Sequence, residues 1–276
     1  MEYRILLAAA LMLTVSIGVS PARAKTLNVE AIINHSNHMA LYQGKTCKGK
    51  VHLKITDRQG RTRLRDLNIL RMDVGENDGN QMHMSYFKAP ADVRKMVFLV
   101  HKTTLPGTDD SRWLYLPSLD MVKRIAAGDK RTSFAGSDFL YEDISGRSLH
   151  EDVHELTGTK NGCYLLKNTP KSPNDLEFSH YIAHINRDTF IPMKVEYYKN
   201  SNVLYRTMEV VKVEKIVADK DGEVVSYPTV TCSKVKNHET GSETVMTFSD
   251  ITYNHPVKKS VFSERYLRRP PRELMR

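Results

Sequence analysis

The run RWLYLPSLDMVKRIAAGDKRTSFAGSDFLYED, residues 112–143, decides the fold of this chain. It begins with Trp113 and Tyr115, which alternate with two leucines. A β-strand points successive side chains to opposite faces, so this alternation predicts a strand that is apolar on both faces. Neither face is then expected to be fully exposed to solvent. Pro117 is expected to end the strand, since proline has no N–H to donate to a neighbouring strand.

A second group of aromatic residues closes the same run. Between the two groups lies a basic segment with Lys123, Arg124, Lys130 and Arg131. Gly136 can adopt backbone conformations that are closed to other residues. Ser137 or Asp138 can cap a short helical turn that carries Phe139 and Tyr141. An aromatic strand followed by such a turn predicts one wall and the rim of an apolar cavity.

The same run resembles the signature of a known family. The pattern W-L-Y-L-P, V-K-R-I-A and F-A-G-S-D-F-L-Y-E-D is similar to that of the LolA-like proteins. These are outer membrane lipoprotein-sorting proteins of Gram-negative bacteria, often found beside RND/MMPL-type lipid exporters. Residues 89–93 (APADV) and 262–267 (FSERYL) extend the resemblance over most of the chain. The resemblance implies a lipid or lipoprotein carrier between an inner-membrane RND/MMPL-type transporter and an outer-membrane acceptor.

The first 24 residues have the features of a secretory signal peptide. Arg4 provides a positive start, residues 5–19 are apolar, and Ala22-Arg23-Ala24 is a small-x-small cleavage site. The apolar run is short for a membrane span, although an uncleaved N-terminal anchor is the alternative. We therefore expect cleavage after Ala24 and a periplasmic protein of residues 25–276, folded as a single domain.

The charge of the chain is basic, with 41 Lys and Arg against 32 Asp and Glu and a formal net charge of +9. Export argues against nucleic acid as the target of this charge. An anionic lipid surface or an acidic docking face would suit it, and so would a basic surface that only keeps the protein soluble. We expect a monomer without a cofactor.

Three cysteines occur, at Cys47, Cys163 and Cys232, without a CxxC pair or zinc-like spacing. In an oxidising periplasm two of them can form a disulfide, which leaves one unpaired. The spacing does not say which two would pair. The interpretation that we favour is that the cysteines are buried as small apolar side chains.

The rest of the chain predicts one helix followed by many strands. Residues 27–44 read as a helix with Asn28 as N-cap and a staple between Leu27 and Ile32. Alternating apolar residues joined by Asn-, Asp- and Gly-rich turns then predict a meander of antiparallel strands. A sheet that long must curl or be covered. The expected fold is mainly β with a few helices (α+β): a strongly curved antiparallel sheet that forms a half-open barrel, its concave face covered by helices near residues 28–43 and 137–144.

One motif points to a different chemistry. His150-Glu151-Asp152-Val153-His154 satisfies H-E-x-x-H, in which a helix lets two histidines bind zinc while the glutamate activates water. Glycines flank the motif and its second half alternates as a strand, where the two histidines would lie about 13 Å apart. A zinc hydrolase is therefore kept only as a remote alternative, and we expect no enzymatic activity.

The function hypothesis rests on an apolar chamber for acyl chains. Its expected lining comprises Trp113, Tyr115, Leu116, Phe134, Phe139, Tyr141, Val97 and Leu99. The alternative is that these side chains are ordinary core residues. A second class of function is a periplasmic regulatory module that recognises an envelope protein, as LolA-like domains in stress sensors do. The basic tail, residues 265–276, is expected to be frayed.

Overall fold

The computed structural model describes residues 28–173 and 176–275, and the expected signal peptide of residues 1–24 and the staple residue Leu27 lie outside this part. The described strands form one antiparallel sheet of thirteen strands in the order β6-β5-β4-β3-β2-β1-β13-β12-β11-β10-β9-β8-β7. The first six strands are β1 Thr46–Thr56, β2 Thr62–Val74, β3 Asn80–Ala89, β4 Val97–Lys102, β5 Ser111–Leu116 and β6 Met121–Ile125. The others are β7 Asp152–Lys160, β8 Cys163–Pro170, β9 His180–Asn186, β10 Pro192–Tyr198, β11 Leu204–Lys220, β12 Glu223–Asn237 and β13 Glu243–Tyr253.

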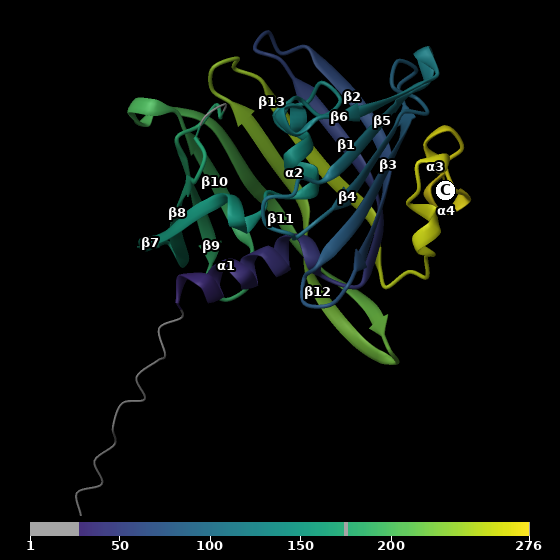
Figure 1. Cartoon of the computed structure of the whole chain (residues 1–276). Coiled ribbons are helices and arrows are strands. Elements are labelled where there is room, and N and C mark those ends of the chain that lie inside the picture. Colours follow the sequence, from purple (N-terminus) through teal and green to yellow (C-terminus); the bar gives the residue numbers. More distant parts are fainter. Residues whose placement is uncertain (1–27, 174–175, 276) are drawn as a thin grey trace, which may run out of the picture.

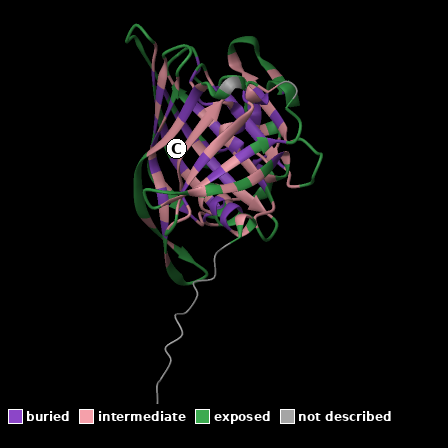
Figure 2. Cartoon of the chain, turned by 90° about the vertical axis from the view of Figure 1, so that its left-hand side faces the viewer, coloured by how far each residue is buried: buried purple, intermediate pink, exposed green. Residues whose placement is uncertain are grey.

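The sheet consists of two meanders joined at one seam. Strands β1–β6 and β7–β13 each follow chain order, and β1 pairs with β13 to join them. The edge strands β6 and β7 do not pair with each other, so the curved sheet stays open (Figure 1). Buried residues concentrate along the middle of the strands, while the loops and the far end of the β11–β12 hairpin are exposed (Figure 2). The half-open barrel predicted from the sequence is confirmed.

The helix at the start of the described chain, α1, spans Val29–Asn37 and continues as a π-helical turn, His38–Tyr42. The predicted N-cap is confirmed, because Asn28 Oδ1 accepts a hydrogen bond from the N–H of Ala31 at 2.7 Å. Arg71 on β2 anchors the other end by donating to the carbonyl oxygens of Leu41 and Gly44 at 2.7 and 2.6 Å. These bonds satisfy carbonyl groups that a helix end leaves without partners.

A segment between the two meanders lies against the concave face of the sheet. We call residues 132–145 the plug segment; it contains the short helix α2, Tyr141–Ser145 (Figure 1). The expected cap at Ser137 or Asp138 is wrong, because α2 begins at Tyr141 and its N-cap residue is Leu140. Its first turn is closed instead by Asp143, whose carboxylate accepts from the N–H of Leu140 at 2.7 Å. The remaining short helical turns are Pro117–Leu119, Ala127–Arg131, Leu149–Glu151, Asn200–Asn202 and Lys259–Val261.

The convex face of strands β2–β5 is covered by the C-terminal strap, residues 256–275, with helices α3 Arg265–Arg268 and α4 Arg272–Met275. Leu267 and Leu274 are completely buried on this face. Asn68 on β2 donates to the carbonyl oxygen of Leu274 at 2.8 Å. The expected frayed tail is therefore wrong for the described residues, because widely spaced apolar side chains fix the basic segment to the sheet.

Removing one of these anchors gives a first prediction. A Leu274→Ala variant should lose about 2–4 kcal/mol of unfolding free energy, the usual cost of a leucine-sized cavity. Urea denaturation of both proteins measures the difference. Replacing the exposed neighbour Met275 by alanine should change stability by no more than about 0.5 kcal/mol. Equal stability of the Leu274→Ala variant and the wild type would contradict packing of the strap.

The basic segment after Pro117 contains an edge strand, β6, that the sequence pattern did not reveal. Its residues Lys123 and Arg124 are exposed and interrupt the apolar alternation. In the antiparallel pairing of β5 with β6, Trp113 lies opposite Arg124 and Leu114 lies opposite Lys123. Charged side chains on an edge strand hinder pairing with other chains, which accounts for their presence there.

Candidate functional site

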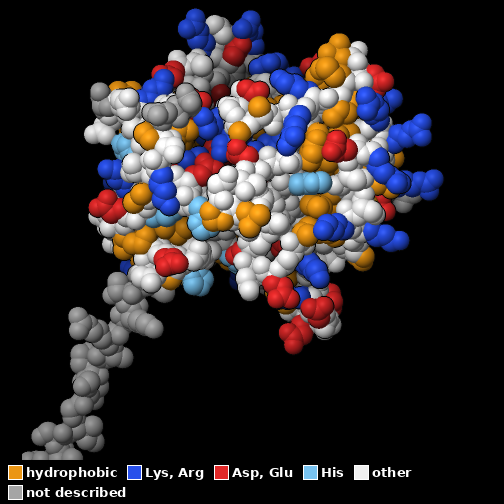
Figure 3. Space-filling view, viewed as in Figure 1, with side chains coloured by type: hydrophobic (Ala, Val, Ile, Leu, Met, Phe, Trp, Pro, Cys, Tyr) orange, Lys and Arg blue, Asp and Glu red, His pale blue; other side chains and the backbone are white. Residues whose placement is uncertain are grey.

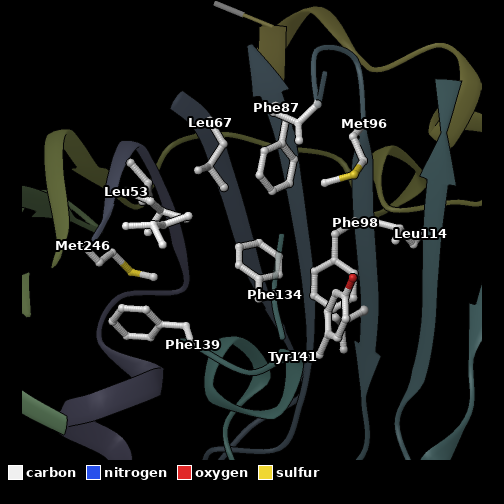
Figure 4. Close-up of a cluster of buried hydrophobic side chains, with 14 of the residues drawn as sticks. Leu53, Leu67, Phe87, Met96, Phe98, Leu114, Phe134, Phe139, Tyr141 and Met246 are labelled. Atoms are coloured by element: carbon white, nitrogen blue, oxygen red, sulfur yellow. The ribbon is translucent and has the colours of Figure 1, made fainter. Parts of the chain in front are cut away.

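The concave face carries an apolar cluster that the plug segment fills from inside. Phe134 is 1% exposed, and its ring centroid lies 5.5 Å from that of Phe87 and 5.6 Å from that of Phe98. The ring of Tyr141 lies 4.9 Å from Phe98, and Phe139 belongs to the same cluster. Figure 4 shows the plug rings beside strand side chains such as Leu67 and Phe87. The apolar interior is therefore occupied by the chain itself.

None of the described strands pairs with the plug segment. Hydrogen bonds that involve side chains hold it against the sheet instead. Its isolated β-bridge joins Ser133 to Leu140 within the segment. Thr244 on β13 donates to the carboxylate of Asp138 at 2.7 Å and accepts from the Asp138 N–H at 2.9 Å. Arg63 on β2 donates to the carbonyl oxygen of Gly136 at 3.2 Å. The segment can leave the sheet without breaking a strand ladder.

A buried ion pair joins the plug segment to the second meander. The guanidinium of Arg206 on β11 binds the carboxylate of Asp143, and both side chains are less than a tenth exposed. Burial disfavours the charged form of Arg206, but Asp143 and the nearby Tyr197 outweigh it, so the pKa of Arg206 lies above its ordinary value. The guanidinium also lies over the ring of Tyr197, 5.0 Å from its centroid.

A second group of charges surrounds the end of the plug segment. Lys130 binds Glu142 and Glu151 at 3.3 and 2.8 Å. Arg147 binds Glu142, Glu151 and Asp152 at 3.2, 2.6 and 2.8 Å. Each of these carboxylates therefore has a cationic partner, and the network links α2 to the start of β7.

The eight residues predicted to line one chamber are divided between two faces. Four contribute to the concave cluster: Leu116, Phe134, Phe139 and Tyr141. The others lie in the convex cluster under the C-terminal strap: Val97, Leu99, Trp113 and Tyr115. They share a face because β4 and β5 pair Val97 with Tyr115 and Leu99 with Trp113. Alternation separates the two sets, but it does not reveal which face is concave. Lipid binding by any of the eight stays a prediction.

Sequence reasoning missed most of the strand residues of the concave cluster. These include Leu53, Leu67, Phe87, Phe98 and Val100, all fully or almost fully buried. The signal was present as apolar alternation in β1 to β4. It could not be assigned to the site, because a buried strand side chain looks the same on either face.

A cavity of about 1170 Å³ opens beside α1, at the polar end of the concave face. Val29, Ile33 and Leu149 give it apolar wall area, and Lys102 and Arg147 also line it. The predicted lining residues are not among those that border it. The expected chamber and this cavity are thus two neighbouring features: an apolar cluster filled by the plug segment, and an open polar cavity beside it.

The H-E-x-x-H motif does not lie on an α-helix. His150 lies in the turn Leu149–Glu151 and His154 lies on β7, as the strand-like pattern predicted. Both ring nitrogens of His154 have partners, Nδ1 with Asn168 Oδ1 at 2.7 Å and Nε2 with the Leu149 carbonyl oxygen at 2.9 Å. Among the described residues, no group of three or more His, Cys, Asp or Glu side chains could hold a metal ion.

His83 on β3 gives a prediction for pH. Burial, with the positive charges of Arg71 and Lys102, lowers the pKa of His83 from 6.5 to about 3. Unfolding exposes an imidazole that binds a proton below pH 6.5, so its contribution to stability is complete above that pH and is lost as the pH falls towards 3. Urea unfolding at several pH values should show a slope of up to about 1.4 kcal/mol per pH unit from this group. His83→Gln should make the slope shallower, and an unchanged slope would contradict a neutral, half-buried His83 in the folded protein.

The fold has close relatives among solved structures. A DUF1329 family protein from Desulfovibrio piger is 26% identical, with a TM-score of 0.75 over 87% of this chain and 98% of that one. An outer membrane lipoprotein-sorting protein domain from Vibrio parahaemolyticus is 22% identical, with a TM-score of 0.73 over 88% and 100% of the two chains. A LolA superfamily protein from Nitrosomonas europaea is 16% identical, with a TM-score of 0.62 over 87% and 99%. The structure is thus a LolA-like half-open barrel, and the resemblance seen in the sequence is confirmed.

A family model described as "uncharacterized protein" matches residues 79–269, more than half of the chain. The chain belongs to this family, DUF1329. No curated protein matches the sequence. No helix in the described part of the chain has the length and apolar character needed to cross a membrane.

Proposed function

We propose that this protein is a periplasmic carrier that binds the acyl chains of a lipid, or of a lipid-modified protein, on the concave face of its sheet. Residues 1–24 would direct export, and residues 25–276 would form the carrier domain. An inner-membrane RND/MMPL-type transporter would supply the cargo and an outer-membrane acceptor would receive it. The role requires binding and release but no catalytic chemistry.

The observation that carries the proposal is the apolar concave cluster closed by the plug segment. Phe134, Phe139 and Tyr141 occupy the space where acyl chains would lie, and they are held by side-chain contacts rather than a strand ladder. Each methylene buried in their place contributes about 0.8 kcal/mol, so a few acyl chains would offset the cost of displacing the plug segment. Return of the plug segment would then drive release.

The surface charge suits approach to anionic envelope components. Lys and Arg gather on the side of the molecule that carries the C-terminal strap (Figure 3), where Arg265, Arg268, Arg269 and Arg272 are exposed. Asp and Glu gather instead at the tip of the β11–β12 hairpin. Such a separation of charge orients a protein at a negatively charged surface.

Native mass spectrometry tests the proposal on residues 25–276, purified from a bacterial periplasm without detergent. The expected result is a non-covalent adduct of lipid mass, or one that forms when the protein is incubated with phospholipid vesicles and then separated from them. A clean protein mass in both preparations would overturn the carrier proposal.

A further inference from the structure

Lys102 places a buried positive charge at the cavity beside α1. Its side chain is 6% exposed at the end of β4 and borders the cavity. Its ammonium donates one hydrogen bond to a described residue, the carbonyl oxygen of Gly146 at 2.8 Å. An ammonium has three N–H donors, and Lys102 forms no ion pair within the part of the chain that the structure describes.

The carboxylates around Lys102 are engaged elsewhere. Asp110 accepts from Arg112 at 2.6 Å and from the N–H of Thr103 at 3.0 Å. Glu142 and Glu151 are bound by the two cations of the network described above. A buried charge without a counter-ion is costly, and burial accordingly lowers the pKa of Lys102. An anion that entered the cavity would remove this cost.

The acidic side chains of the cavity wall do not repel such an anion strongly, because each is either paired with another group or exposed to water. Asp78 pairs with His38 at 2.9 Å. Asp152 is held by Arg147 and also accepts from the hydroxyl of Tyr181 at 2.7 Å. Glu30 and Glu76 are exposed at the rim, where water screens their charges.

The direction of β4 connects this charge to the apolar cluster. Lys102, Val100 and Phe98 alternate with the convex residues and therefore share the concave face. The rise of a strand places Lys102 about 13 Å from Phe98. An amphiphile whose charged group lies in the cavity could extend its chain along β4 into the space of the plug segment.

We propose that Lys102 binds the anionic group, a carboxylate or phosphate, of the ligand taken up by the cavity. The inference rests on the proposed carrier function and narrows its cargo to amphiphiles with a negatively charged head. Such a ligand gains a charge-assisted hydrogen bond that a neutral amphiphile of equal chain length cannot form.

The test compares a long-chain fatty acid with the alcohol of the same chain length, each displacing a fluorescent acyl probe from residues 25–276. The acid should bind about tenfold more tightly than the alcohol. Lys102→Met should abolish this difference and Lys102→Arg should retain it. Lys54→Met is the matched control, because Lys54 is exposed on the opposite face of the sheet and its loss should leave the preference unchanged.

The outcomes separate the two proposals. Equal binding of acid and alcohol to the wild type, or a preference that survives Lys102→Met, would overturn Lys102 as the site of a lipid head group and leave the carrier function standing. Binding of neither compound would overturn the carrier function. Inorganic phosphate is the second probe: thermal stabilisation by phosphate that Lys102→Met removes, without any acid preference, would assign the site to a free anion instead of a lipid head.

Discussion

An Asp143→Ala variant is expected to lose about 3–5 kcal/mol of unfolding free energy, because it leaves the buried guanidinium of Arg206 without its carboxylate. Arg206 also donates to the carbonyl oxygen of Asp138 at 3.2 Å, which cannot neutralise its charge. Urea denaturation at neutral pH measures the loss. The same variant should bind a fluorescent acyl probe more tightly, since the plug segment loses one of its attachments to β11.

Two controls determine whether the burial of this pair matters. Asp250→Ala breaks the exposed pair of Asp250 with Lys50 and should cost no more than about 1 kcal/mol. The double variant Asp143→Leu/Arg206→Met removes both charges and should recover most of the stability. If Asp143→Ala cost no more than Asp250→Ala, the proposed attachment of the plug segment would be wrong.

A Phe134→Ala variant is expected to show opposite changes in stability and binding. Removal of a fully buried ring at the centre of the concave cluster should cost about 3–5 kcal/mol. In a carrier whose plug segment competes with cargo, the space left by the ring should accept part of an acyl chain. Acyl-probe binding should therefore become about tenfold tighter, the equivalent of roughly two buried methylenes.

Phe262→Ala is the matched control for this prediction. Phe262 is also 1% exposed, but it belongs to the C-terminal strap and packs against the convex face. The two variants should lose similar stability, and only Phe134→Ala should gain affinity. Increased binding in both variants would indicate non-specific uptake by partly unfolded protein, and the argument for the concave face would fail.

The strands could be predicted from the sequence because each carries its own signal. Val51, Leu53 and Ile55 alternate with polar residues, and the structure places all three on the concave face. Pro117 ends β5 as expected. Local alternation with turn residues at both ends is sufficient to locate a strand.

The site could not be predicted in the same way, because it depends on contacts that are distant in the sequence. Asp143 and Arg206 are 63 positions apart, and β1 pairs with β13 across most of the chain. Lys102 follows an apolar run and has no local sign that it borders a cavity. The prediction of a frayed C-terminal tail failed for the same reason. The burial of its leucines depends on contacts with the convex face, which are distant in the sequence.

The position of the bound acyl chain tests the central claim most directly. Trp113 is the single tryptophan and lies on the convex face, so a brominated fatty acid should leave its fluorescence almost unchanged. In the double variant Trp113→Phe/Phe139→Trp the fluorophore moves to the plug segment, and the same ligand should quench it strongly. Quenching of Trp113 in the wild type, with none in the double variant, would place the cargo on the convex face and contradict a concave carrier site.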